Sequence, residues 1–325
     1  MTENKVTIIG PAIIDILAGP IGSKIFEVGS MPMNEIKMSY GGNGYNESYV
    51  LKQLGVNVEL YSTLGNDEAG HKILDKLNNL AINTEHVIIK DDVSTSINIV
   101  LFDEKAERRF LTNPFGSQRR MSEEDVIDGN MDFGNIVCFS CMFISPLFDI
   151  RSMERVFRII KEKNNRILVV DMTKAKNGES IEQLSPLFSY IDYILPNEEE
   201  LLLLSGSDID SSAQDLLNKG VGCVVVKKGA RGCTVYTRDS SVDVKAFKTD
   251  QLVDSTGAGD CFAAGFIYGL FNNMKLRECA MFANVVASCC VECVGATEGI
   301  VSVEEPMRRY EALYASFTEE ENGNR

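Results

Sequence analysis

The stretch Asp254-Ser255-Thr256-Gly257-Ala258-Gly259-Asp260 places a turn with almost no side chains between two carboxylates, and it leads directly into the apolar segment Cys261–Phe271. A helix that begins there leaves its first backbone N–H groups without intrahelical partners, and its dipole favours an anion at that end. Asp260, in the first turn, is then a candidate general base for an attacking hydroxyl, as phosphoryl transfer requires. Taken alone, the same residues also fit a plain strand-to-helix turn in which Asp260 only complements the dipole.

Length and composition describe a globular chain with enough apolar residues for a large core. It has 325 residues, 44% of them hydrophobic, and a net charge of −15. This charge disfavours a nucleic-acid partner. The apolar run Ile136–Phe148 is interrupted by polar residues and is shorter than the ~20 residues of a membrane-spanning helix, and the N-terminus lacks the features of a signal peptide. We therefore expect a cytoplasmic protein that binds neither nucleic acid nor membrane.

The nine cysteines are expected to be reduced thiols. Two C-x-x-C pairs, Cys138–Cys141 and Cys290–Cys293, leave a four-thiolate zinc site as an alternative, but their apolar neighbours favour buried free thiols. The two histidines, His71 and His86, lack the neighbours of a catalytic dyad or metal site, and we expect them at the surface or at element boundaries.

Short β-branched runs alternate with longer amphipathic segments along the chain. The predicted strands are Lys5–Ile9, Val58–Thr63, Ile136–Phe139, Ile167–Asp171, Tyr193–Leu195 and Cys223–Lys227. The predicted helices are Tyr45–Leu54, Asp67–Leu80, Ile150–Lys163, Glu198–Leu204 and Ala213–Lys219. Such alternation implies right-handed βαβ units and a mainly parallel sheet with helices on both faces. Neither a repeat nor a linker divides the chain, so residues 1–325 are predicted to be one domain, ending in a solvated tail at Thr318–Arg325.

Two motifs resemble signatures of the ribokinase (pfkB-type) carbohydrate kinase family. Asp254–Asp260 is similar to its D-T-x-G-A-G-D, with Ser255 in place of Thr, and Gly41-Gly42-Asn43-Gly44-Tyr45-Asn46 is similar to its G-G-x-x-x-N. The resemblance implies a ribokinase-like three-layer α/β sandwich with a small β lid, placed near residues 15–40 and 94–112. It also implies ATP-dependent phosphorylation of a primary hydroxyl on a small sugar or polyol, with Asp260 as base and Gly257–Gly259 as anion hole. In many members the lid pairs with a second subunit, so a homodimer is expected.

The resemblance also assigns the sugar-binding residues: Asp15 after the first strand, together with Gly41, Gly42, Asn43 and Asn46. An amide and a carboxylate suit hydroxyl recognition. Members of the family often carry Lys at the position of Asn43, so the identity of the substrate stays open.

Further segments complete the implied site. Lys227–Gly232 resembles the nucleotide-side T-x-G-x-x-G turn through Lys227, Gly229 and Gly232, and Asn284 lies where relatives flank the adenine. Asn197 and Glu200 match an N-x-x-E motif that positions Mg²⁺-bound water, and they also fit a helix-capping box. Asp254 with the segment Val291–Ala296 resembles a monovalent cation site, which implies K⁺.

Three other functions remain open from the sequence. A nucleoside kinase would stack a base on lid aromatics such as Phe26, Phe102, Phe110 or Phe115. A phosphosugar kinase would need cations, which Arg108, Arg109, Arg119 and Arg120 offer. The third is a non-catalytic sugar- or nucleotide-binding regulator, against which the intact base and anion turn argue.

Overall fold

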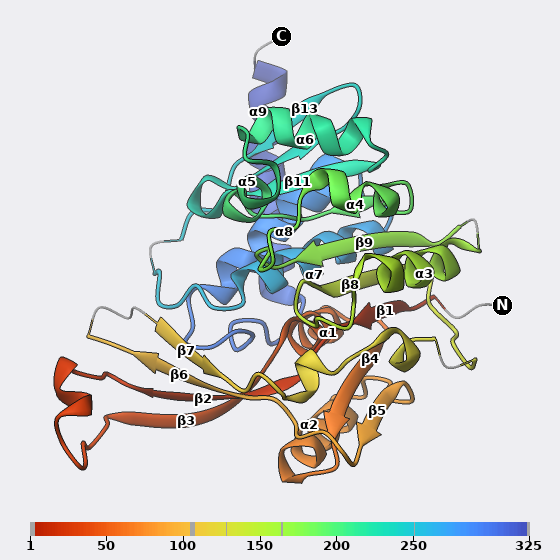
Figure 1. Cartoon of the computed structure of the whole chain (residues 1–325). Helices are drawn as coiled ribbons and strands as arrows, with labels where there is room; N and C mark the ends of the chain where they lie inside the picture. Colours follow the sequence, from red (N-terminus) through yellow and green to blue (C-terminus); the bar gives the residue numbers. More distant parts are fainter. Residues whose placement is uncertain (1–3, 105–107, 128, 164, 250, 324–325) are drawn as a thin grey trace.

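The computed structural model describes residues 4–104, 108–127, 129–163, 165–249 and 251–323, with the backbone alone over residues 316–323. In this part of the chain nine strands form a central sheet, parallel from β5 to β11 and antiparallel at β12 and β13 (Figure 1). Their spatial order is β13 (Ser241–Val244), β12 (Cys233–Tyr236), β11 (Cys223–Lys227), β10 (Tyr193–Ile194), β9 (Ile167–Met172), β8 (Ile136–Met142), β1 (Val6–Ile9), β4 (Val58–Gly65) and β5 (Val87–Lys90).

Helices cover both faces of this sheet. One face carries α1 (Asn43–Gln53), α2 (Glu68–Asn79), α7 (Ala258–Phe271), α8 (Leu276–Cys290) and α9 (Glu304–Gly323). The other carries α3 (Ile150–Lys161), α4 (Ile181–Phe188), α5 (Glu198–Ser205) and α6 (Ile209–Asn218). The core has two halves, one on each face of the sheet, because successive side chains of a strand point to opposite faces. On β11, for example, Val225 packs against the first group of helices and Val224 against the second. The predicted three-layer α/β sandwich with a mainly parallel sheet is confirmed.

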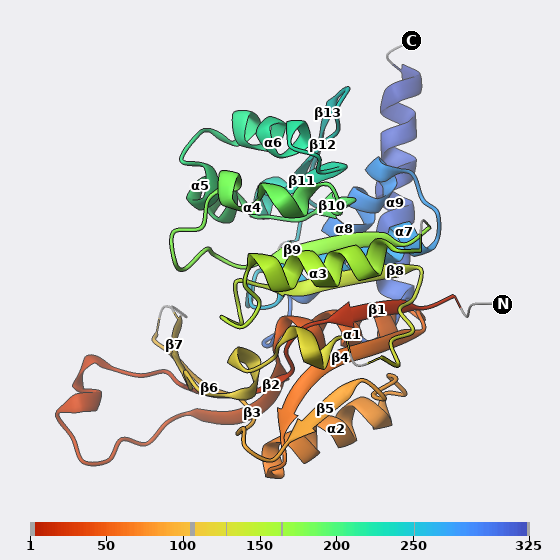
Figure 2. The same ribbon diagram turned by 45° about the vertical axis from the view of Figure 1, so that its right-hand side comes forward.

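A second sheet projects from the body, as Figures 1 and 2 show. Its strands are β3 (Glu35–Gly41), β2 (Ile13–Gly19), β6 (Ile97–Phe102) and β7 (Arg108–Thr112), which lie in the two segments where the sequence placed the lid. The register pairs Asp15 with Asn98, so these two residues share one face. Ile16 pairs with Met38 and Ile99 on the opposite face.

Some elements were not predicted from the sequence or differ from it. β2 begins at Ile13, slightly before the predicted lid segment, and its residues pair on both edges within the lid sheet. Helix α4 was not predicted, because it contains Pro186, which cannot donate to the carbonyl of Glu182. The hydroxyl of Ser185 donates to that carbonyl instead, at 2.8 Å. The helix therefore keeps the carbonyl satisfied despite its proline.

His71 is exposed and His86 directly precedes β5, as predicted, although His86 is buried and stacks on Tyr61 with ring centroids 4.1 Å apart. Helix α9 continues to Gly323, so residues 318–323 of the predicted tail are helical, and residues 324–325 lie outside the described part.

The cysteines are free thiols, and each of them except Cys293 is buried. Among the described residues no group of thiolates has the spacing of a metal site, so the zinc alternative finds no support there. Within the same part of the chain, every helix is too short or too polar to cross a membrane.

Candidate active site

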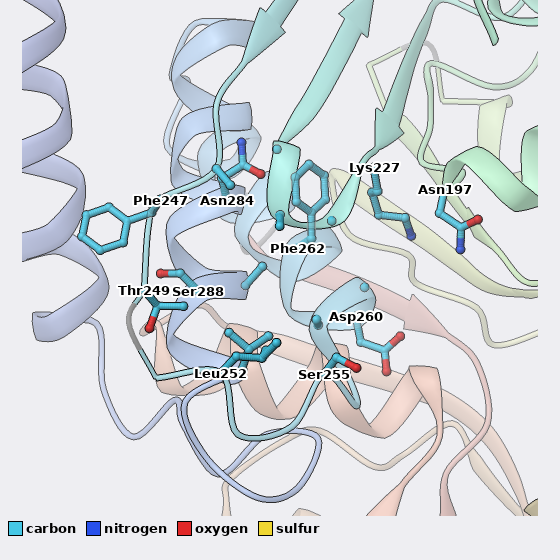
Figure 3. A pocket seen from close by; sticks show the side chains of 18 of the residues that line it. Asn197, Lys227, Phe247, Thr249, Leu252, Ser255, Asp260, Phe262, Asn284 and Ser288 are labelled. Carbon is cyan, nitrogen blue, oxygen red and sulfur yellow. The ribbon is translucent and has the colours of Figure 1, made fainter. Parts of the chain in front are cut away.

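A cavity of about 670 Å³ lies beyond the carboxyl ends of the parallel strands, where α/β sheets commonly bind ligands. Figure 3 shows Asp260, Lys227 and Asn197 at one end of it, and Phe247, Thr249 and Ser288 at the other. The cavity brings together residues that the sequence predicted in separate motifs: Asn43, Asn197, Glu200, Lys227, Gly229, Gly232, Ala258, Gly259, Asp260 and Asn284.

The turn before α7 is built for close approach to its backbone. Gly257 caps the helix with a φ of 73°, and a Cβ at that position would lie 2.3 Å from the carbonyl oxygen of Ala296. Only glycine fits this conformation and this space. At Gly259, in contrast, a Cβ would meet nothing nearer than the Nζ of Lys227, at 3.6 Å. The N–H group of Ala258 donates to the carbonyl oxygen of Ser255 at 3.3 Å, but the first helical turn at Gly259 and a lysine amine border the same opening, a suitable place for an anion.

Asp260 projects into the cavity from the first turn of α7. Its Oδ2 accepts a hydrogen bond of 2.6 Å from the Nδ2 of Asn46. Burial is the main cause that raises the pKa of Asp260 to about 7, and the carboxylates of Asp171 and Glu200 also raise it, whereas Asn46 and Lys227 lower it. A carboxylate whose pKa lies near neutrality is well suited to general-base catalysis.

This contact gives Asn46 a partner that the sequence did not predict. The sequence assigned its side chain to the sugar, but the structure directs its amide nitrogen at Asp260, and the amide oxygen is buried without a partner among the described residues. This contact orients the carboxylate of the candidate base, and the sugar contact that the resemblance implies stays a prediction.

Lys227 is paired with Asp171 at the end of β9, through an Nζ–Oδ1 distance of 2.7 Å. Burial opposes the lysine's charge, but the carboxylates of Asp171 and Glu200 outweigh it and raise the pKa of Lys227 above its usual value. The amine therefore stays charged beside the anion turn. Glu47, on α1, is fully buried nearby, and burial together with the charges of Asp171 and Asp260 raises its pKa well above the usual value.

Asp15 lies on the lid, outside the main cavity wall. Its Oδ1 accepts from the Nδ2 of Asn98 at 3.0 Å, and burial raises its pKa. Gly41 faces this carboxylate, because a Cβ there would lie 2.1 Å from Asp15 Oδ2. Gly42 has a φ of 89°, and a Cβ there would lie 2.5 Å from the carbonyl oxygen of Pro11. The two glycines thus make room for Asp15 and for the entry into α1.

Asp254 does not present a free carboxylate. Its Oδ1 accepts from the backbone N–H and the hydroxyl of Thr256, and its Oδ2 accepts from Gly295 N–H and from the guanidinium of Arg108 on β7. These four donors fill the acceptor positions of a carboxylate. Arg108 already supplies a positive charge at this carboxylate, and the monovalent cation that the resemblance implies stays a prediction.

Asn197 and Glu200 form the capping box that the sequence predicts at the start of α5. Asn197 Oδ1 accepts from Glu200 N–H at 2.8 Å, and Glu200 Oε2 accepts from Asn197 N–H at 2.7 Å. Both residues also line the cavity, where their oxygens suit Mg²⁺, a cation that prefers oxygen ligands.

The nucleotide-side residues shape the far wall of the cavity. Gly229 and Gly232 have φ values of 57° and 90° in the turn between β11 and β12. Asn284 donates to the carbonyl oxygens of Val244 and Lys245, at 3.2 and 3.3 Å. It therefore holds the segment after β13 against α8 while lining the cavity.

Sequence reasoning missed several residues of this site. Asp171 carries a usable signal, because it lies at the carboxyl end of a predicted parallel strand. Glu47 and Asn98 carry none, since a polar residue in a helix or a strand of a small sheet is usually solvated.

The profile of the pfkB family of carbohydrate kinases matches residues 3–302. The chain belongs to this family. It is therefore a transferase, a sugar or nucleoside kinase with the ribokinase-like fold.

Two relatives and one solved structure illustrate the family's range. An uncharacterized sugar kinase of Archaeoglobus fulgidus is 29% identical over 77% of this kinase and 97% of its own length. A nucleoside kinase of Methanocaldococcus jannaschii is 23% identical, over 87% and 89% of the two chains. A putative ribokinase II from E. coli, solved in complex with ATP and Mg²⁺, superposes with a TM-score of 0.79 at 22% identity, covering 95% of this chain and 99% of its own.

Proposed function

We propose that this kinase transfers the γ-phosphoryl group of ATP to a primary hydroxyl of a small, neutral sugar or polyol, with Asp260 as the general base. The observation that carries the proposal is the meeting of three groups at one end of the cavity: the N-terminus of α7, the amine of Lys227 and the carboxylate of Asp260. A binding protein without activity has no need for a carboxylate whose pKa is raised to about 7 by its surroundings.

In the proposed reaction Asp260 takes the proton of the acceptor hydroxyl as its oxygen bonds to the γ-phosphorus, and the bond from that phosphorus to the ADP oxygen breaks. The helix N-terminus at Gly257–Gly259 and the Lys227 ammonium stabilise the charge on the transferring group. Asn197 and Glu200 would hold Mg²⁺, which neutralises phosphate charge when bound. Asn46 keeps the carboxylate of Asp260 oriented.

A neutral acceptor is supported by the charges around the lid. Asp15 and Asn98 offer hydroxyl-binding groups there, and a phosphate beside Asp15 would meet a like charge, although the charge of Arg108 also acts on Asp15. Of the four arginines that a phosphosugar kinase could use, Arg108 is engaged with Asp254, and Arg119 lines a separate cavity of about 480 Å³. None of the four is among the residues lining the main cavity in the described part of the chain.

A coupled ADP-release assay with a panel of sugars, sugar phosphates and nucleosides tests this proposal. We expect the highest kcat/KM for an unphosphorylated sugar. A sugar phosphate with a higher kcat/KM than every other compound, selectively weakened by Arg108→Ala or Arg119→Ala, would contradict a neutral substrate. No turnover with any member of the panel, despite measurable ATP binding, would favour a regulator.

A nucleoside kinase is the second candidate, and one feature of the lid favours it. Phe102 and Phe110 lie on the same face of the lid as Asp15. Asp15 pairs with Asn98, and alternation along β6 puts Asn98, Val100 and Phe102 on one face. Phe110 pairs with Val100 and therefore lies on that face too. Aromatic rings on this face could stack on a base. The nucleosides in the panel separate the two functions.

We also propose that the kinase forms a homodimer through the outer face of the lid. Ile36 and Met38 of β3, Ile99 of β6 and Leu111 of β7 lie on this face, and 40 to 71% of each residue's surface is exposed. Aligned apolar side chains of this kind commonly mark a protein interface.

A further inference from the structure

Glu47 is an acidic side chain that the proposed reaction does not use. It follows Asn46 on α1 and is 0% exposed, and neither of its carboxylate oxygens has a hydrogen-bond partner among the described residues. The thiol of Cys138 on β8 lies beside it, but a thiol is only a weak donor. A buried carboxylate without a partner is costly, so such a group calls for a ligand or a proton.

The surroundings of Glu47 favour a positively charged ligand. One oxygen from each of Glu47, Asp171 and Asp260 lies within 4.8 Å of the others, although the residues come from three separate elements, α1, β9 and α7. Lys227 neutralises one of these charges through its ion pair with Asp171. The carboxylates of Glu47 and Asp260 remain, and the negative charge of Glu200 also acts on Asp260 and on Lys227.

We propose that Glu47, Asp171 and Asp260 bind one divalent cation when nucleotide is absent. Oxygen ligands lie about 2.0 to 2.1 Å from Mg²⁺ and about 2.3 to 2.6 Å from Ca²⁺, so two ligands of one ion are at most roughly 4 to 5 Å apart. Three oxygens within 4.8 Å of one another are near enough for one ion to reach all of them. Three carboxylates with water in the remaining positions suit Mg²⁺, Mn²⁺ or Ca²⁺ rather than a thiol-preferring metal.

This site differs from the Mg²⁺ position proposed at Asn197 and Glu200, which needs the nucleotide's phosphates. One consequence for turnover rests on the proposed function. The ion and the acceptor hydroxyl compete for the carboxylate of Asp260. Free divalent cation in excess of ATP should therefore inhibit the parent enzyme, and Glu47→Gln should reduce this inhibition.

The decisive experiment is a titration of the full chain with Mn²⁺ in the absence of ATP and sugar, followed by electron paramagnetic resonance of the free ion. We expect the parent to bind one Mn²⁺, and Glu47→Gln and Asp171→Asn each to weaken that site at least tenfold. Glu59→Gln is a matched control, because Glu59 is equally buried but already paired with Lys5 and Thr7, and its Mn²⁺ binding should equal that of the parent.

Thermal unfolding provides a second readout that does not depend on turnover. Mn²⁺ should raise the Tm of the parent and leave that of Glu47→Gln unchanged, while Glu47→Gln should be the more stable of the two in metal-free buffer. A parent that binds no Mn²⁺ without nucleotide, or a Glu47→Gln variant that binds it equally well, overturns the proposal and indicates that Glu47 is simply protonated. Because neither measurement uses ATP or sugar, this result would leave the kinase proposal intact.

Discussion

Replacing Asn46 by Ala tests whether this residue sets the ionisation of the base. The amide donates to Asp260 at 2.6 Å, and a hydrogen bond to a charged group contributes about 1.5 to 3 kcal/mol. Since 1.36 kcal/mol corresponds to one pKa unit, losing the bond should raise the pKa of Asp260 from about 7 to roughly 8 or 9. The base acts only when ionised, so kcat/KM at pH 6 should fall about 10 to 100-fold and recover largely near pH 10.

The assay is the pH profile of kcat/KM, measured with saturating Mg-ATP between pH 5.5 and 10. Asn98→Ala is a matched control, because it removes an amide-to-carboxylate bond of similar length, 3.0 Å, from Asp15 rather than from Asp260. Asn98→Ala should raise the KM for the sugar without shifting the acidic limb of the pH profile. If Asn46→Ala lowers kcat/KM equally at every pH, Asn46 binds the sugar and the reasoning about the base fails.

Asp260→Asn keeps the side-chain shape but removes the proton acceptor, so kcat should fall about 10² to 10⁴-fold. The affinity for ATP, measured by calorimetry, should be retained. A variant that keeps more than about a tenth of the parent kcat would rule out Asp260 as the base. Excess EDTA should abolish turnover and added Mg²⁺ restore it, and undiminished transfer would exclude a catalytic metal. Because Arg108 is paired with Asp254, the parent should have the same kcat in sodium, potassium and choline buffers. Stimulation by K⁺ should appear only in Arg108→Ala, and a parent whose kcat depends on K⁺ would contradict this prediction. Met38→Lys should convert a dimer into a monomer in sedimentation, and a monomeric parent would remove the lid interface.

Local patterns were sufficient where neighbours in sequence are also neighbours in space. The capping box of Asn197 and Glu200 and the turn before α7 are such features, and the structure contains both. Strand β11 (Cys223–Lys227) was predicted with its observed bounds, because its β-branched run is short and bounded by glycines.

Contacts between distant segments could not be predicted in this way. Asn46 and Asp260 are 214 residues apart, and each fits its own motif without the other. The same holds for Arg108 and Asp254, 146 residues apart, because periodicity and motif spacing do not specify which side chains meet across a fold. Family resemblance placed Asn46 near the sugar, but only coordinates show that its amide faces the base.

The ion pair between Arg108 and Asp254 also joins the lid to the segment that leads into the anion turn. Moving β7 away from the body would break this pair and leave the buried Asp254 carboxylate with its neutral donors from Thr256 and Gly295 alone. A sugar that holds the lid against the body would thereby stabilise the turn that receives the phosphates. Linkage is reciprocal, so the nucleotide must favour sugar binding by the same factor. The two substrates should consequently bind with positive cooperativity, and Arg108→Ala should make their affinities independent of each other.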